Sequence, residues 1–140
     1  MITKELLFHK TSIPAVGKAL DASMLRSKAI AQNIANVDVP GYQRVEVEFE
    51  KELRDALDKT KLKGTKTNKQ HMDIGRRDLS KVKPESYKPI DPTLPSGMNN
   101  VDIDMENAKL AENQIVFNYA VKFAQSRYSA VQQSIRGVNR

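Results

Sequence analysis

Apolar residues recur every three or four positions along the N-terminal part of the chain. If Ile13 starts a seven-residue frame, its first and fourth positions are Ile13, Val16, Leu20, Ser23, Ser27, Ile30, Ile34 and Val37. Six of these eight are large and apolar, which is typical of an amphipathic helix. The spacing predicts a helix over 11–36. Ser12 and Pro14 suit its first turn, because hydroxyl residues and early prolines are common there.

A second and stronger periodicity fills the C-terminal part. From Ile103 the same frame is apolar, Ala or Tyr at nine of eleven positions, and it predicts a helix that ends near Gly137. Asp102, Asp104 and Glu106 stand at its start, where carboxylates complement the helix dipole. We expect the two stripes to form an intrachain seam, whose main residues are Ile13, Leu20, Ile30, Ile34, Leu110, Phe117, Val121, Tyr128, Val131 and Ile135.

The middle of the chain is polar and rich in proline. Val45, Val47 and Phe49 alternate like a strand, whereas Phe49, Leu53 and Leu57 recur like a helix. We expect an extended segment to about 48 and a short helix from about 49 to 58. Residues 58–99 contain four prolines within twelve residues and few apolar side chains, so we expect a loop, an extended segment or conditional disorder.

The predicted fold is mainly α. Long N- and C-terminal helices pair as a coiled-coil-like hairpin, because neither stripe is stable in water and a seven-residue repeat favours this packing. The chain divides into an N-terminal helix with its exit turn (1–42), a largely irregular middle with one short helix (43–99) and a C-terminal helix (100–140). The first and last parts together form one helical core.

Each helix carries a second apolar face that the seam leaves uncovered. On the first helix this face holds Ala15, Ala22 and Ala29, and on the second it holds Ile115, Val116, Tyr119 and Phe123. An apolar surface beyond what a hairpin buries marks an interaction site. We therefore expect these residues to contact neighbouring subunits. The alternative is a local three-helix cluster, in which 49–57 folds back.

Composition narrows the functional classes. The length of 140 residues suits one domain, and four Phe, four Tyr and no Trp argue against a large enzyme core with a deep pocket. The absence of cysteine excludes disulfides, thiolate metal sites and cysteine nucleophiles. No apolar run is long enough for a transmembrane helix, and the first ten residues lack the apolar region of a signal peptide. We expect a cytosolic protein, or one exported without a cleaved signal.

Three groups of residues are candidates for chemical sites. Asp102, Asp104 and Glu106 resemble the start of a calcium loop, but its glycine and final glutamate are replaced by Asn107 and Asn113. His9 and His71 lie far apart, and no catalytic motif stands out, so we expect no enzyme, metal, cofactor or small-molecule substrate. A basic stretch could bind nucleic acid but lacks aromatic residues for stacking. It consists of Lys59, Lys61, Lys63, Lys66, Lys69, Arg76 and Arg77.

The stretch 33–44, NIANVDVPGYQR, predicts a rigid exit from the first helix. Asn36 can end the helix, and Val39 is pushed into an extended conformation by the following proline. Pro40 and Gly41 fit the central positions of a type II turn. Tyr42 can then pack the turn back onto the helix.

These residues resemble the signature of the flagellar axial family of bacteria, which comprises rod, hook and hook–filament junction proteins. In that family Asn-Ile-Ala-Asn and a Thr-Pro-Gly-Tyr-like turn close the N-terminal helix. The chain departs from this pattern only at Val39, where Thr or Ser is common. The matching residues are Asn33, Ile34, Ala35, Asn36, Pro40, Gly41 and Tyr42.

A second block, 97–120, resembles the C-terminal signature of a proximal rod member of this family. The segments VEVEF at 45–49 and TNKQHM at 67–72 resemble the same member. The similarity therefore covers nearly the whole chain in order. Within the block it is carried by Asn100, Val101, Asp102, Glu106, Leu110, Glu112, Asn113 and Gln114.

The resemblance implies a structural subunit of the rod that crosses the periplasm and carries torque. It implies export from the cytoplasm through the flagellar type III channel. The implied partners are further copies of the chain, the rod proteins FlgC, FlgF and FlgG, the ring-junction protein FliE and the export gate. From the residues alone, two other functions fit, namely a basic nucleic-acid-binding protein using Lys59–Arg77 and a soluble helical adaptor or chaperone.

Overall fold

The structure is a computed structural model of the chain. It describes residues 12–58, 78–90 and 97–137, together with the single residues 60, 64, 68, 71, 75 and 95. The elements in chain order are α2 (Ile13–Ala35), β1 (Glu46–Glu48), α3 (Glu50–Leu57), the 3-10 helix η1 (Leu79–Lys81), β2 (Glu85–Tyr87) and α4 (Ile103–Arg136).

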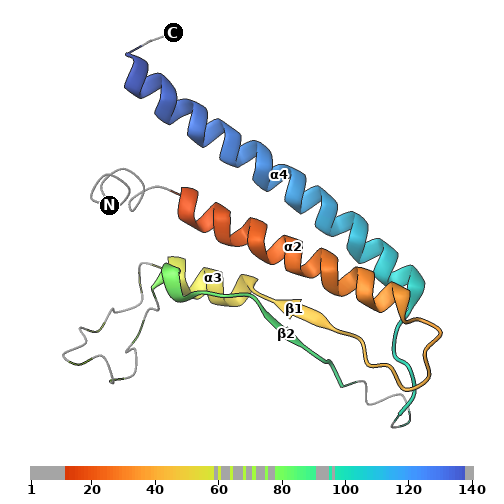
Figure 1. Cartoon of the computed structure of the whole chain (residues 1–140). Helices are drawn as coiled ribbons and strands as arrows, with labels where there is room; N and C mark the ends of the chain where they lie inside the picture. The colour runs from red at the N-terminus through yellow and green to blue at the C-terminus, as the bar shows by residue number, and fades with distance from the viewer. Residues whose placement is uncertain are drawn as a thin grey trace.

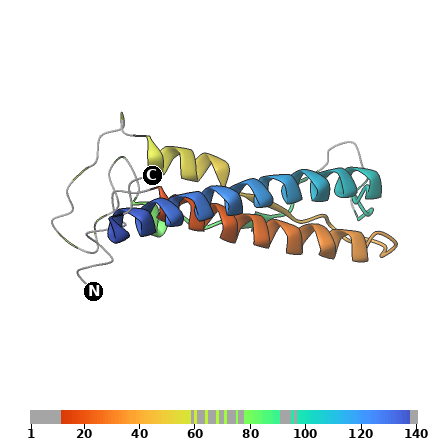
Figure 2. The same cartoon turned by 90° about the horizontal axis from the view of Figure 1, so that it is seen from above.

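These elements form three layers around α2. Figure 1 shows α4 on one side of α2, running antiparallel to it, and β1, β2 and α3 on the other side. Figure 2, turned by 90°, shows α2 and α4 lying along each other over most of the length of α2. The predicted fold class, a mainly helical chain with paired terminal helices, is confirmed.

The helix ends follow from local chemistry. Asp102 is the N-cap of α4, and its carboxylate accepts hydrogen bonds from the backbone N–H groups of Asp104 and Met105 at 2.9 and 3.2 Å. Gly137 ends α4 with a φ of +67°, the left-handed conformation that glycine adopts without strain. Ser12 occupies the N-cap of α2, although its side chain makes no capping bond. Asn36 follows the last residue of α2, as predicted.

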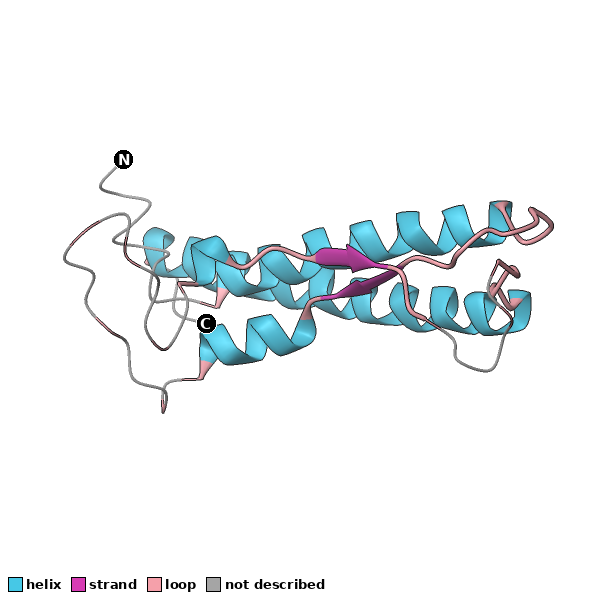
Figure 3. Cartoon of the chain, turned by 90° about the horizontal axis from the view of Figure 1, so that it is seen from below, coloured by secondary structure: helices cyan, strands magenta, loops and turns pink. Residues whose placement is uncertain are grey.

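The described part of the middle segment contains regular elements. The predicted extended segment and short helix are found as β1 and α3. The antiparallel pairing of β1 with β2 was not predicted, and it places Glu46 opposite Tyr87, Val47 opposite Ser86 and Glu48 opposite Glu85. Figure 3 shows the two short strands side by side across the helical hairpin. The partner strands are distant in sequence, so local periodicity could not pair them.

A small apolar core joins the middle segment to α2. It consists of the buried residues Ala22, Phe49, Ala56 and Val82, with the partly buried Ala19, Leu53 and Leu79 against them. The segment 49–57 thus folds back onto the hairpin, which is the local cluster that the sequence left open. Packing of this kind removes apolar surface from water and so stabilises the docked segment.

Two of the expected intersubunit residues are therefore corrected. Ala22 and Ala29 are only 2% and 4% exposed within the single chain. The middle segment covers Ala22, and Ala29 lies in the floor of a groove beside β1. An alanine stripe gives no sign of which element will cover it, because small residues favour any close approach. Ala15, the third residue of this face, is partly buried.

Candidate functional site

A cluster of buried polar side chains holds α2, β1 and α4 together. At its centre is Asn33, which is fully buried. Its amide nitrogen donates to the Val45 carbonyl oxygen at 2.9 Å and to Glu106 Oε2 at 3.0 Å. Its amide oxygen accepts from the Val45 N–H at 2.9 Å and from the Tyr42 hydroxyl at 3.2 Å. One asparagine therefore satisfies groups from three segments, and we call this arrangement the Asn33 clasp.

The buried carboxylate of Glu106 faces a cation. Glu106 is 1% exposed, and its Oε1 lies 3.8 Å from Nη1 of Arg44. Arg44 also donates to Glu46 Oε1 at 2.7 Å, and its backbone N–H donates to Asn100 Oδ1 at 2.7 Å. A carboxylate is buried at acceptable cost only with such partners, so Arg44 is part of what keeps Glu106 in the seam.

A second clasp lies two turns further along α4. The amide nitrogen of Asn113 donates to the Ser23 carbonyl oxygen at 2.9 Å and to Ser27 Oγ at 2.8 Å. The Ser23 hydroxyl donates to Asn113 Oδ1 at 2.8 Å. Both Ser23 and Asn113 are buried. These bonds, the Asn113 clasp, fix the register of the two helices because a shift by one residue would leave them unpaired.

The exit turn of α2 is fixed from the far side of the chain. The Tyr42 N–H donates to the Val39 carbonyl oxygen at 3.3 Å, and Gly41 has a φ of +74°, as a type II turn requires. The side-chain amide of Asn99 donates to the carbonyl oxygens of Asn36, Val37 and Val39 at 2.7–2.9 Å. The segment before α4 therefore holds the turn after α2.

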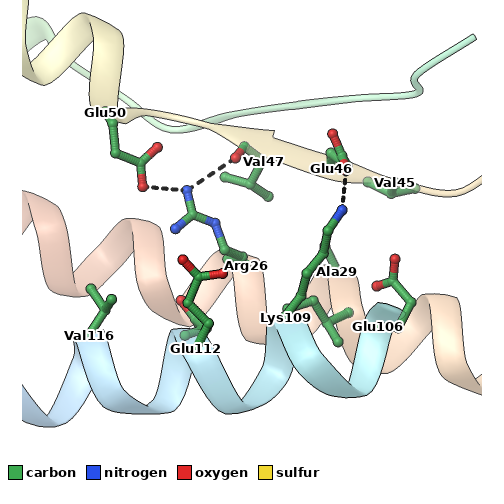
Figure 4. A pocket seen from close by; sticks show the side chains of 12 residues that line it. Arg26, Ala29, Val45, Glu46, Val47, Glu50, Glu106, Lys109, Glu112 and Val116 are labelled. Atoms are coloured by element: carbon green, nitrogen blue, oxygen red, sulfur yellow. Dashed lines mark hydrogen bonds and ion pairs between the residues drawn. The ribbon is translucent and has the colours of Figure 1, made fainter. Parts of the chain in front are cut away.

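A groove of about 480 Å³ lies between β1, α2 and the first half of α4. Figure 4 shows that Arg26 and Lys109 pair with carboxylates across it, and that Glu112 also borders it. Arg26 donates to Glu50 Oε1 at 2.6 Å and to the Val47 carbonyl oxygen at 3.2 Å, and Lys109 forms an ion pair with Glu46. These contacts join α2 to α3 and α4 to β1.

The same contacts shift the ionisation of two carboxyls and one phenol. Burial raises the pKa of Glu46, but hydrogen bonds from Lys109 and Tyr87 and the nearby cations outweigh it, so the pKa lies below its ordinary value. Burial also raises the pKa of Glu50, but its hydrogen bond with Arg26 outweighs this effect, so the pKa of Glu50 lies below its ordinary value. The hydrogen bond to Glu46, at 2.7 Å, raises the pKa of Tyr87.

The charged contacts of the groove join separate elements of the chain. The cations of the groove are committed to carboxylates of the same chain. Within the described residues no group of three or more His, Asp or Glu side chains could hold a metal ion. Nor does any helix in the described ranges have the length and apolar character needed to cross a membrane. The arrangement can set the register of the layers.

The outward side of α4 exposes large apolar side chains. Ile115 is 70% exposed and Tyr119 75%, and Val116, which also lines the groove, is 48% exposed. Phe123 is partly buried, and the guanidinium of Arg127 lies 4.8 Å from its ring centre. Figure 1 shows α4 as an outer layer, with α2 on its inner side.

The predicted seam needs correction along α4. The side chains of Tyr128 and Ile135 are 52% and 72% exposed, and that of Leu110 is 36% exposed. The buried residues of α4 are Glu106 and Asn113, which lie one position before the frame residues Asn107 and Gln114. Ile30 is buried, whereas the remaining seam residues are partly buried, namely Ile13, Leu20, Ile34, Phe117, Val121 and Val131.

The other predicted residues are placed as follows. Asn33, Asn36, Tyr42, Asn100, Asp102, Glu106 and Asn113, all from the family motifs, make side-chain hydrogen bonds. Glu112 lines the groove. Ile34 and Val101 are partly buried, and Ala35, Pro40 and Gly41 are exposed. His9 and the basic residues Lys59, Lys61, Lys63, Lys66, Lys69, Arg76 and Arg77 lie outside the described residues.

Sequence reasoning missed Arg44, Glu46, Asn99 and Lys109. The sequence did contain a signal for the Asn113 clasp. Ser23 and Ser27 are the two polar positions in the otherwise apolar frame of α2. A polar residue inside an apolar seam needs a partner across it. Asn113 is that partner for both.

Characterised proteins resemble this chain over most of its length. It is 38% identical over 104 residues to the flagellar basal body rod protein FlgB of Borreliella burgdorferi, which covers 71% of this chain and 76% of that protein. FlgB of Bacillus subtilis is 29% identical over 134 residues, covering 94% and 97%. FlgB of Escherichia coli is 30% identical over 128 residues, covering 86% and 85%. No protein-family model matches the chain.

Proposed function

The chain belongs to the FlgB family of structural proteins of the flagellar basal body rod, and from this premise we propose that it assembles with further copies of itself into the proximal rod. The observation that carries the proposal is the exposed apolar side of α4. Burying large apolar side chains such as Ile115 and Tyr119 against a neighbour is favourable, and a patch of this kind marks an interaction site.

A rod also requires contacts that do not close on themselves. Heterologous contacts, in which different surfaces of two subunits meet, generate helical filaments. The chain offers two unlike surfaces, the apolar side of α4 and the charged outer side of the middle segment. We propose that Ile115, Val116, Tyr119 and Phe123 lie in such a contact, with Ala15 at its edge.

The proposed partners, export route and location of the subunit rest on its resemblance to the family. We propose that the subunit contacts the rod proteins FlgC, FlgF and FlgG and the ring-junction protein FliE. We also propose that it passes the flagellar type III export gate without a cleaved signal peptide, and that it lies in the rod where this crosses the periplasm. Its role there is to transmit torque, not to catalyse a reaction.

Nucleic-acid binding through Lys59–Arg77 has no support from the comparisons. The relatives are rod proteins by name. We therefore do not retain it as a second function.

Electron microscopy of cells that lack the gene tests the proposal. We expect rod, hook and filament to be lost and to return when a plasmid supplies the gene. Normal flagella in a strain with no second copy of the gene would contradict the rod assignment.

A surface variant tests the proposed contact in the same strain. We expect Tyr119→Asp on the plasmid to prevent rod assembly, because a carboxylate would be buried without a partner. Tyr119→Phe keeps the ring and should restore rods. Normal rods with Tyr119→Asp would remove this side of α4 from the rod contacts.

A further inference from the structure

Four exposed side chains form a line on the outward side of α4. Glu106 and Asn113 point from α4 toward α2. At 3.6 residues per turn, Ile115, Tyr119 and Lys122 fall on the opposite half of the helix, and Glu112 lies at the edge of this half, where it also borders the groove. The four residues lie within about 80° of one another. All four are exposed. We call these four residues the outer stripe.

The outer stripe has the same sequence of residue types when read from either end, namely charged, apolar, apolar and charged. Only the sign of the charge differs between its two ends. An acid and a base flank two apolar residues, and the spacings are three, four and three residues. The small exposed residues Ala108 and Ser126 continue the line four residues beyond each end. Neither Glu112 nor Lys122 has an ion-pair partner among the described residues.

We propose that the free subunit dimerises through the outer stripe, with α4 of a second copy packed antiparallel about a two-fold axis. Such an axis brings Glu112 beside Lys122 of the second copy, and it does so twice. It also places Ile115 against Tyr119 of the second copy, again twice. The small residues Ala108 and Ser126 let the two helices approach closely at either end.

Charge selects this partner arrangement. A parallel pair in register would place Glu112 against Glu112 and Lys122 against Lys122, and like charges in contact are unfavourable. The antiparallel pair makes all four contacts favourable and is isologous, because the same surface serves both copies. It covers Ile115 and Tyr119, so it excludes the proposed rod contact, but it concerns the free subunit and does not depend on rod assembly.

Sedimentation equilibrium of the purified full chain tests the pairing. We expect a concentration-dependent dimer that Glu112→Lys or Lys122→Glu weakens about tenfold, because each reversal turns two attractive pairs into repulsive ones. The double variant Glu112→Lys/Lys122→Glu should restore the dimer. Lys83→Glu makes the same charge change at an exposed site between η1 and β2 and should have no effect. Circular dichroism confirms that each variant is folded.

Cysteine crosslinking tests the direction of the helices, since the chain has no cysteine of its own. A mixture of Ile115→Cys and Tyr119→Cys subunits should form the mixed disulfide dimer in preference to either homodimer, because a disulfide needs Cα atoms within about 7 Å. A monomer at all concentrations, a dimer unaffected by the charge reversals, or no preference for the mixed crosslink would overturn the proposal. Failure here would leave the rod assignment standing, because that is measured in cells.

Discussion

At the scale of single residues, amides and carboxylates join the two long helices. Asn33 satisfies groups from the exit turn, from Val45 just before β1 and from α4, and Asn113 satisfies groups of Ser23 and Ser27. Each is buried, so each bond matters more for what its loss would leave unpaired than for its own net strength. This explains physically why these amides belong to the motifs that carry the family resemblance.

The Asn33 clasp predicts a large effect from one substitution. We expect Asn33→Ala to lower the free energy of unfolding by about 3 kcal/mol, because each buried group left without a partner costs roughly 1–3 kcal/mol. Urea unfolding of the purified chain measures this. Gln32→Ala, at the exposed neighbouring position, is the control and should change stability little. Equal effects of the two variants would refute the role of the clasp.

The lowered pKa of Glu46 predicts sensitivity to acid. Because its folded pKa lies below the ordinary value of 4.5, the ionised carboxylate stabilises the fold at neutral pH. That contribution is complete above the unfolded pKa and is lost as the pH falls through the folded pKa. The stability gap between the wild type and Glu46→Gln should therefore narrow on acidification.

Urea unfolding at pH 7 and about pH 3.5 measures this gap, since the ordinary carboxyl pKa lies between these values. Glu48→Gln changes the exposed carboxyl at the other end of β1 and is the matched control. A gap for Glu46→Gln that stays constant between the two conditions would show that its ion pair with Lys109 does not stabilise the fold.

At the scale of elements, the middle segment is held to α2 mainly by Phe49. Its side chain is 2% exposed and packs with Ala22, Ala56 and Val82. β1 and β2 are only three residues each, and such a short pair is marginal by itself. The core beneath α3 is therefore what orders this layer.

Removing the Phe49 ring should undock that layer. We expect Phe49→Ala to cost about 3–5 kcal/mol of stability, the usual loss for a buried Phe. Leu57→Ala, at a side chain 47% exposed, should cost much less. Chemical unfolding compares the two variants, and hydrogen exchange of the α3 amides reports undocking. Unchanged protection of α3 in Phe49→Ala would contradict this account.

At the scale of the whole molecule, the inner and outer sides of the hairpin have separate roles. The inner side holds the fold, and the outward side of α4 retains apolar surface that the single chain does not bury. In such a subunit the inner contacts stabilise the fold, and the outer apolar surface is available to bind a neighbouring subunit. Stability and assembly should then respond to different substitutions.

Two isoleucines separate these roles. We expect Ile30→Ala, at a residue 3% exposed, to lower stability by about 2–5 kcal/mol. Ile115→Ala, at a residue 70% exposed, should change stability by less than about 0.5 kcal/mol yet reduce motility in complemented cells. Unfolding curves and swimming assays measure the two effects. A stability loss in Ile115→Ala equal to that in Ile30→Ala would refute the separation.

Local sequence patterns predicted the two long helices, the segment 45–58 and the family. The periodicity of α2 and α4, the acidic start and glycine end of α4, and the type II turn all depend on residues close in sequence, so local chemistry predicts them. The strand-then-helix order of 45–58 was readable for the same reason.

Only the tertiary structure decided which surfaces meet. The bonds of the clasps between α2 and α4 join residues 73 to 90 positions apart, and β2 pairs with a strand far back in the chain. The seven-residue frame from Ile103 falls on Asn107 and Gln114, so it left the preceding residues Glu106 and Asn113 outside the seam and placed Tyr128 and Ile135 within it. Burial of a polar side chain depends on partners from distant segments, and periodicity carries no record of them.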